Sequence, residues 1–143
     1  MIVLRLIDKY FPPKIAYAHC DVPCGIYDPK IAQIAAATVA KMVEKINALP
    51  KENPTVADRN LFVRAVKVKE EHAQKCKEEL LILWTDYFKE EHLEEFSDLH
   101  DKFWKAAKLC SKNKQSVDAQ AAADLVAAVD EIAQIFAKSK ASK

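Results

Sequence analysis

Residues 28–50 read DPKIAQIAAATVAKMVEKINALP, and their apolar side chains recur every three or four positions. This interval places them on one face of an α-helix. Asp28 is a favoured N-cap residue and Pro29 suits the first helical turn, so we expect the helix to begin here and to end near Leu49-Pro50. The side chains expected to face a core are Ile31, Ile34, Ala35, Val39, Met42, Val43 and Ile46.

A second, longer helix is expected from Asn53-Pro54 to about Phe88. Alternating charges over residues 67–79 predict that the middle of this helix faces solvent or another subunit. The positions expected to point toward the core are Phe62, Val63, Val66, His72 or Ala73, Leu80, Leu83 and Trp84.

Two further helices complete the pattern. After an expected loop over residues 90–96, Ser97 can cap a third helix and Ser116 can cap a fourth. A single glycine among 143 residues also favours helix. Four amphipathic helices with short connections predict an all-α, up-down-up-down four-helix bundle. Its expected core positions in the last two helices are Leu99, Phe103, Trp104, Ala107, Leu109, Ala121, Leu125, Val126, Val129, Ile132, Ile135 and Phe136.

Length and composition narrow the class of protein. We expect one domain from 143 residues. The sequence contains no run of 18 apolar residues, so no membrane span is predicted. The formal net charge of +1 gives no argument for a nucleic-acid partner. Four cysteines in a charged, glycine-poor chain are not typical of a secreted disulfide scaffold, so a reducing compartment is expected. Cys76 and Cys110 are expected to be buried apolar side chains and not ligands.

Residues 19–28, HCDVPCGIYD, place an imidazole, two thiols and a phenol directly before the first expected helix. For an arbitrary Cys-x-x-x-Cys pair, a disulfide, half of a zinc site or unrelated thiols would be the simpler interpretations. Zinc normally takes four protein ligands, but Cys76 and Cys110 lie far apart in the sequence, and the spacing of His72, His92 and His100 does not resemble an HExxH motif. The pair alone is therefore a weak signal.

A chain that began at His19 would offer a distinctive donor set. Its free α-amine, the deprotonated amide nitrogen of Cys20 and the thiolates of Cys20 and Cys24 can occupy a square plane, with the His19 imidazole as a fifth, axial ligand. Tetragonal coordination by nitrogen and sulfur favours nickel or copper over zinc. The anionic donors also stabilise a higher oxidation state of the metal, which suits one-electron chemistry.

Three stretches of the chain resemble one known family. Residues 19–29 (HCDVPCGIYDP) resemble the nickel hook that begins mature nickel-containing superoxide dismutases. Residues 83–89 (LWTDYFK) look like the second characteristic stretch of that family, and residues 132–136 (IAQIF) are similar to its C-terminal run. The resemblance covers essentially all of residues 19–143. It implies that two superoxide anions and two protons become dioxygen and hydrogen peroxide, as one nickel ion per chain cycles between Ni(III) and Ni(II).

The resemblance also implies roles for individual residues. The nickel ligands would be His19, Cys20 and Cys24, within a hook formed by residues 19–27. The residues that would shape the approach of the anion and deliver protons are Tyr27, Asp21, Tyr87 and Asp86.

Two positions depart from the family pattern. A glutamate and an arginine, which hold the axial imidazole in the best-known members, correspond here to Ala35 and His72. We therefore expect the surroundings of the imidazole to differ, and such surroundings tune ligand orientation and redox potential. These two changes support one alternative interpretation, a nickel or copper carrier that does not catalyse the reaction. A helical interaction protein with incidental cysteines is a third interpretation.

Residues 1–18 precede the hook, and while they remain the α-nitrogen of His19 is an ordinary amide that cannot bind a metal. Their ending, Ala16-Tyr17-Ala18, suits a secretory signal, but charged residues interrupt the apolar run. The resemblance implies instead a short pro-segment, which a dedicated maturation peptidase removes in the cytoplasm to leave a single domain over residues 19–143. It also implies a homohexamer, whose neighbouring subunits would shield the hook.

Overall fold

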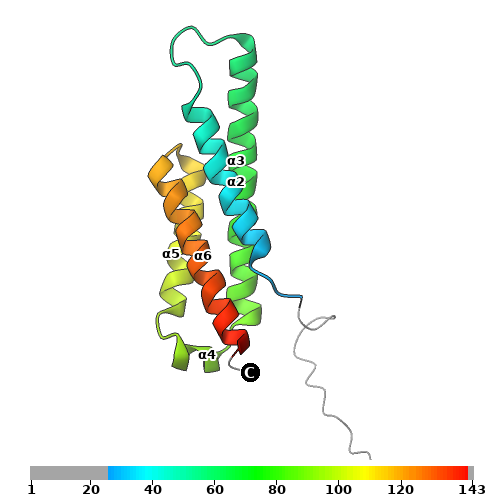
Figure 1. The fold of residues 1–143 in the computed structure, drawn as a ribbon, viewed down its shortest axis with the longest axis vertical. Helices are drawn as coiled ribbons and strands as arrows, with labels where there is room; N and C mark the ends of the chain where they lie inside the picture. Colours follow the sequence, from blue (N-terminus) through cyan, green and yellow to red (C-terminus); the bar gives the residue numbers. More distant parts are fainter. Residues whose placement is uncertain (1–25, 142–143) are drawn as a thin grey trace, which may run out of the picture.

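A computed structural model of the chain describes residues 26–141, and every regular element in this range is helical. The chain runs in one direction along α2, back along α3, forward along α5 and back along α6 (Figure 1). The expected all-α, up-down-up-down bundle is confirmed. The bounds of its elements are α2 (Lys30–Asn47), α3 (Val56–Ile82), the π-helical turn η1 (Leu83–Tyr87), α4 (Glu90–Glu95), α5 (Leu99–Gln115) and α6 (Ala119–Ala141).

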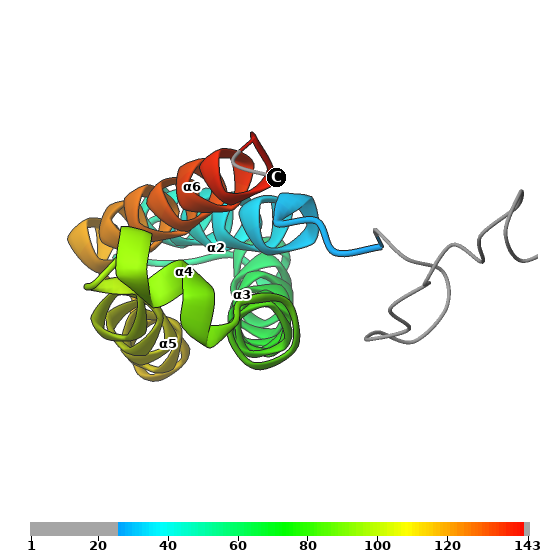
Figure 2. The same ribbon diagram turned by 90° about the horizontal axis from the view of Figure 1, so that it is seen from below.

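The four long helices form a closed ring around one core. Helix α2 contacts α3 and α6, and α5 contacts the same two helices from the opposite side. The short helix α4 crosses the lower end of the bundle (Figures 1 and 2). None of the helices within residues 26–141 is long and apolar enough to cross a membrane.

The buried face of α2 is built largely from small side chains. Ala32, Ala35 and Ala36 are at most 1% exposed and lie beside Val39, Val43 and Ile46. The prediction that Ile31 and Ile34 face the core is wrong, because these side chains are 44% and 55% exposed. The alanines occupy the inward positions of these turns and allow the neighbouring helices to approach closely, so the isoleucines point outward.

The hairpin of α2 and α3 extends beyond α5 and α6 at one end of the molecule (Figure 1). Phe62 and Val63 lie in this projecting part of α3 and are 45% and 65% exposed, so their assignment to the core is wrong. Neither α5 nor α6 reaches this part of α3, so no helix of the second pair covers these two side chains (Figure 1). Trp104 on α5 is also exposed, against expectation.

Several predicted helix ends also need correction. Helix α3 is capped by Thr55, whose hydroxyl accepts from the Asp58 backbone N–H while the Asp58 carboxylate accepts from the Thr55 N–H. The predicted loop at 90–96 contains helix α4, and the residue that precedes α5 is Asp98, not Ser97. At the start of α2, the Asp28 carboxylate accepts from the Lys30 N–H at 2.8 Å, but the residue that directly precedes the helix is Pro29, not Asp28.

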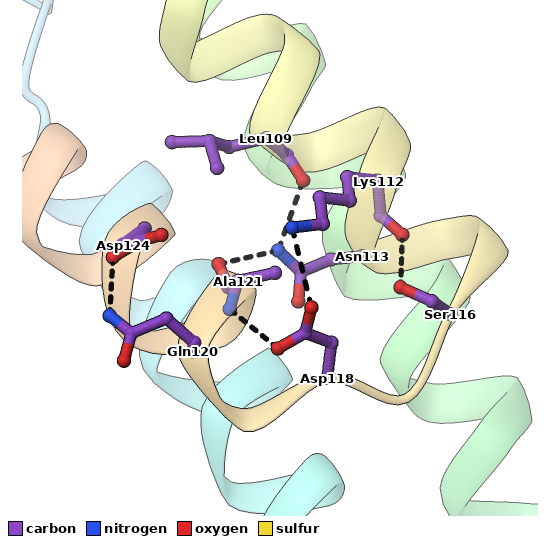
Figure 3. Close-up of polar contacts among 8 residues, drawn as sticks. All are labelled: Leu109, Lys112, Asn113, Ser116, Asp118, Gln120, Ala121 and Asp124. Atoms are coloured by element: carbon purple, nitrogen blue, oxygen red, sulfur yellow. Dashed lines mark hydrogen bonds and ion pairs between the residues drawn. The ribbon is translucent and has the colours of Figure 1, made fainter.

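Ser116 ends α5 and does not cap the following helix (Figure 3). Its hydroxyl donates to the Lys112 carbonyl at 2.9 Å, whereas the Asp118 carboxylate accepts from the Ala121 N–H at 3.0 Å and caps α6. That backbone hydrogen bond holds the pKa of the Asp118 carboxyl below its usual value. The Asn113 side-chain amide donates to the Ala121 carbonyl at 2.9 Å and joins the two helices.

Lys69 is the largest exception to the predicted exposed face of α3. Its side chain is 2% exposed, and its ammonium donates to the carbonyl oxygens of Asn113, Lys114 (3.2 Å) and Ser116 (3.0 Å). The last carbonyls of a helix lack partners within the helix and carry its negative dipole end, so a cation is favourable there. Burial lowers the pKa of this amine because it penalises the charged form, and the negative charge of Glu70 offsets part of that shift.

We predict that Lys69→Met lowers the free energy of unfolding by about 2–3 kcal/mol, because it keeps the buried stem and removes a charged donor from otherwise unpaired carbonyls. Chemical denaturation followed by circular dichroism measures this change. The matched control is Lys67→Met, which removes an exposed lysine 3.7 Å from Glu71 and should change the same free energy by less than about 0.5 kcal/mol. Equal effects of the two substitutions would contradict the capping role of Lys69.

Candidate functional site

The predicted site residues divide into two groups. Tyr27, Asp86 and Tyr87 lie in the part of the chain that the structure describes. The predicted nickel ligands and one predicted catalytic residue lie outside the described residues; these are His19, Cys20, Cys24 and Asp21.

The structure brings Tyr27 and Tyr87 together from distant parts of the sequence. Their ring centroids are 5.8 Å apart, with an angle of 57° between the ring planes. Tyr27 directly precedes the Asp28-Pro29 start of α2, and Tyr87 is the last residue of η1. The stretch that carries the donor residues therefore joins the bundle beside a second phenol.

The π-helical turn sets the direction of Tyr87. The Phe88 N–H donates to the Leu83 carbonyl at 3.1 Å, a bond that spans five residues where an α-helix spans four. Leu83 and Phe88 are buried, while Tyr87 is half-buried at the end of the turn. Single π turns inside helices are frequent at functional sites. Sequence analysis extended the helix through these residues and did not predict the change in geometry.

Aromatic rings surround Tyr87 on several sides. Its ring centroid lies 4.5 Å from that of Phe136, 4.9 Å from that of Phe88 and 5.8 Å from that of His92. The Tyr87 hydroxyl lies 2.9 Å from the Ser139 hydroxyl. The ring is therefore fixed by α6, by α4 and by the residue that follows the π turn.

Sequence reasoning missed His92 and Ser139. His92 falls in the segment predicted to be a loop, where it is 6% exposed and its Nδ1 accepts from the Lys89 N–H at 2.9 Å. That hydrogen bond leaves the proton of the neutral ring on Nε2. Ser139 lies in a C-terminal stretch rich in lysine and serine. No periodic signal distinguishes either residue.

Asp86 does not join the aromatic group. It is exposed, and among the described residues its carboxylate accepts a hydrogen bond from the Thr85 hydroxyl at 2.8 Å. Its place one residue before Tyr87 puts the carboxylate at the rim of the group. Any contribution from Asp86 must therefore come from the solvent side.

The two positions that depart from the family pattern lie side by side. Ala35 and His72 line one hollow of about 160 Å³, together with Ile31, Ile34 and Lys75. His72 Nδ1 lies 2.8 Å from the Val68 carbonyl oxygen, so this nitrogen carries a proton, and in the neutral ring Nε2 is the hydrogen-bond acceptor.

The burial predicted for Cys76 and Cys110 is confirmed, because both side chains are 0% exposed. The Cys76 thiol donates a hydrogen bond to the Cys110 sulfur, and this bond, together with burial, raises the pKa of the Cys76 thiol. The same bond lowers the pKa of Cys110. Metals bind thiolates, so a thiol kept protonated is a poor ligand. Within residues 26–141, no group of three or more His, Cys, Asp or Glu side chains is arranged to hold a metal ion.

Comparison with known proteins gives consistent matches. A family model described as nickel-containing superoxide dismutase matches residues 14–140. Proteins named superoxide dismutase [Ni] from Streptomyces seoulensis and Streptomyces coelicolor are 38% and 36% identical over 131 residues, which cover 89% of this chain and 95% of each relative. A crystal structure of a Ni-containing superoxide dismutase, with nickel ligation corresponding to the oxidized state, has a TM-score of 0.74 at 36% identity and covers 85% of this chain and 98% of its own.

We predict that Cys76 and Cys110 do not react with a thiol reagent while the protein is folded, because neither sulfur is accessible and the Cys76 thiol stays protonated. A variant with Cys20→Ser and Cys24→Ser isolates these two thiols for measurement with a chromogenic disulfide. No colour should develop before denaturant is added, and two thiols per chain should react afterwards. Rapid labelling under native conditions would contradict the burial of these two thiols.

Proposed function

The chain belongs to the family of nickel-containing superoxide dismutases, and we propose that His19, Cys20 and Cys24 hold its nickel ion. The protein is an oxidoreductase that acts on superoxide and uses nickel as its cofactor. The carrier alternative is not favoured, because the curated relatives are themselves named as superoxide dismutases.

The donor chemistry of residues 19–24 fits nickel. His19, Cys20 and Cys24 together offer two thiolates, an amide nitrogen, an amine and an imidazole, a set of nitrogen and sulfur donors that would suit nickel. Nickel held by these residues would supply the one-electron couple by which one superoxide anion is oxidised to dioxygen and a second, with two protons, is reduced to hydrogen peroxide. The residues of the chain must admit a small anion, orient it and place proton donors beside it.

The contact between Tyr27 and Tyr87 is the observation that carries this assignment. Only three peptide steps separate Cys24 from Tyr27, so their Cα atoms lie at most about 11 Å apart even in a fully extended chain. The proposed ligand thiolate is therefore confined to the neighbourhood of the two phenols. This proximity supports roles for Tyr27 and Tyr87 in orienting superoxide and its water, with Asp21 in the hook and Asp86 at the rim.

We further propose that residues 1–18 form a pro-segment and that a maturation peptidase removes it in the cytoplasm. The chemical reason is the amine of His19, because an α-nitrogen within a peptide bond lacks a lone pair for a metal. The product of cleavage is the domain over residues 19–143.

The assembly proposed for the mature protein is a homohexamer. A hook of nine residues buries little surface by itself, so neighbouring protomers would have to shield the nickel and its thiolates. Exposed apolar side chains on several elements support such contacts. They include Ile26 (53% exposed), Ile31 (44%), Ile34 (55%), Phe62 (45%), Val63 (65%), Ile82 (42%) and Trp104 (54%).

We predict that protein beginning at His19 takes up one nickel ion per chain and consumes superoxide, whereas the precursor does neither, because its α-nitrogen is blocked. Mass spectrometry, metal analysis and a superoxide assay on both forms measure this. Mature protein with Cys24→Ser is the control and should lose activity.

The possible outcomes separate the hypotheses. A precursor that is as active as the mature form would contradict the role of the His19 amine. Stoichiometric nickel binding without consumption of superoxide would instead favour a carrier.

We predict a sedimentation coefficient and a native mass that correspond to six chains for the mature, nickel-loaded protein. Introducing charge at an exposed apolar position, for example Trp104→Glu, tests whether that face takes part in assembly. Lys105→Glu is the control for charge, because this exposed lysine pairs with Asp101 and does not stack on Trp104. A monomer in the nickel-loaded state would overturn the hexamer.

A further inference from the structure

We propose that Ser139 is a positioning residue that fixes the direction of the Tyr87 hydroxyl group during the reaction. The proposal rests on the role of Tyr87 proposed above. It concerns a residue near the end of α6 that does not belong to the predicted site. Its support is the hydrogen-bond geometry of one buried hydroxyl group.

The proton of the Ser139 hydroxyl is already committed. Its Oγ lies 2.9 Å from the Phe136 carbonyl oxygen and 2.9 Å from the Tyr87 hydroxyl oxygen. A carbonyl oxygen can only accept, so the single serine proton points to Phe136. The bond between the two hydroxyl groups must then run from Tyr87 to Ser139.

Burial of the Ser139 side chain favours this direction of the hydrogen bond, from Tyr87 to Ser139. The Ser139 side chain is 2% exposed, so bulk water does not compete for its oxygen. The Tyr87 ring has little freedom to turn away, because the Phe136 ring lies 4.5 Å from it, centroid to centroid, and Phe88 packs edge-on at 4.9 Å. One turn of α6 thus supplies a packing ring, a carbonyl acceptor and the serine.

The Ser139 hydroxyl does not require the contact with Tyr87 to satisfy its own proton. Its proton is satisfied within the helix by Phe136, and an alanine could fill the position without leaving an unpaired donor. Tyr87 is the partner that gains, because it acquires a buried acceptor for its proton. Because the contact satisfies the proton of Tyr87 and not that of Ser139, we infer that its role is to orient the phenol.

The consequence concerns which part of the phenol faces the site. With its proton directed to Ser139, the Tyr87 oxygen presents lone pairs to other groups and acts toward them as an acceptor. It can therefore hold a water molecule or another hydroxyl group whose proton points elsewhere, toward the bound anion. Without Ser139 the phenol proton can turn toward the site, and the Tyr87 oxygen no longer acts there only as a hydrogen-bond acceptor.

The test compares variants of the mature, nickel-loaded enzyme. Ser139→Ala should lower kcat/KM by up to about tenfold, the equivalent of one hydrogen bond. Ser139→Thr retains a hydroxyl and should recover most of the loss, whereas Ser139→Val, of nearly the same shape, should not. In a Tyr87→Phe background, Ser139→Ala should cause no further loss.

A second measurement does not depend on nickel. Metal-free protein labelled with ¹³C at the tyrosine Cζ atoms gives one signal for each tyrosine, and Tyr87→Phe identifies the signal of Tyr87. Ser139→Ala and Ser139→Val should shift that signal and leave that of Tyr27 in place, while Ser139→Thr should leave both near their original positions. The comparison of Thr with Val holds even if the alanine variant folds poorly.

The outcomes separate this inference from the proposed function. If Tyr87→Phe keeps full turnover, the catalytic role of Tyr87 fails, and the Cζ signal still reports whether Ser139 holds the phenol. If Tyr87→Phe lowers turnover while the alanine and valine variants match the parent protein in kcat/KM and in the Cζ shift, the positioning role of Ser139 is wrong.

Discussion

The π-helical turn at the end of α3 is the constraint on which the site depends. In an α-helix, residues five positions apart are separated by about 140° around the axis, so Leu83 and Phe88 would face different directions. The hydrogen bond from the Phe88 N–H to the Leu83 carbonyl adds a residue to the turn and lets both side chains enter the core. Tyr87 is thereby left at the edge of the core, where it reaches Tyr27 at the start of α2 and Ser139 near the end of α6. A local change of helix geometry therefore connects the two ends of the described chain.

The rest of the bundle holds that arrangement in place through contacts of different kinds. Small residues on α2 allow close packing with its neighbours, and Lys69 ties the middle of α3 to the end of α5 through carbonyl oxygens. At the turn between α5 and α6, Asn113 links the helices while Asp118 starts the second one. These contacts lie away from the aromatic group, so the helices that carry Tyr87 and Ser139 are positioned independently of the metal. This separation is consistent with a bundle that is formed before nickel binds.

Sequence periodicity predicted the helices and their order but was less reliable about which side chains are inside. Ile31 and Ile34 share a stripe with Ala35, and hydrophobicity alone favours the larger residues, although the alanine is the buried one. Phe62 and Val63 follow a proper helical interval, yet only the tertiary structure reveals that α3 projects beyond its partners there. Ser116 satisfies the rules for capping, and Asp118 two residues later satisfies them equally well. The pairing of Tyr27 with Tyr87 was anticipated only through family resemblance, and Ser139 could not be anticipated because a hydroxyl in a lysine-rich tail has no distinctive pattern.

The four cysteines illustrate how environment, and not residue type, decides metal chemistry. A thiol becomes a ligand only after it loses its proton, and loss of the proton requires solvation or a nearby positive charge. Cys76 and Cys110 lack solvation, since both are fully buried between α3 and α5. The pKa of Cys76 is raised, whereas a hydrogen bond from Cys76 and the charge of Lys77 lower the pKa of Cys110, so that burial is what keeps Cys110 from a metal ion. Cys20 and Cys24 precede the bundle in a stretch where, after cleavage, an α-amine would stand beside the first thiol. A protonated amine or a bound metal ion would favour the thiolate there, so the same side chain can serve as packing in one part of the chain and as donor in another. The division of the cysteines into two pairs therefore follows from the position of the core, because the core determines which thiols are accessible to a metal ion.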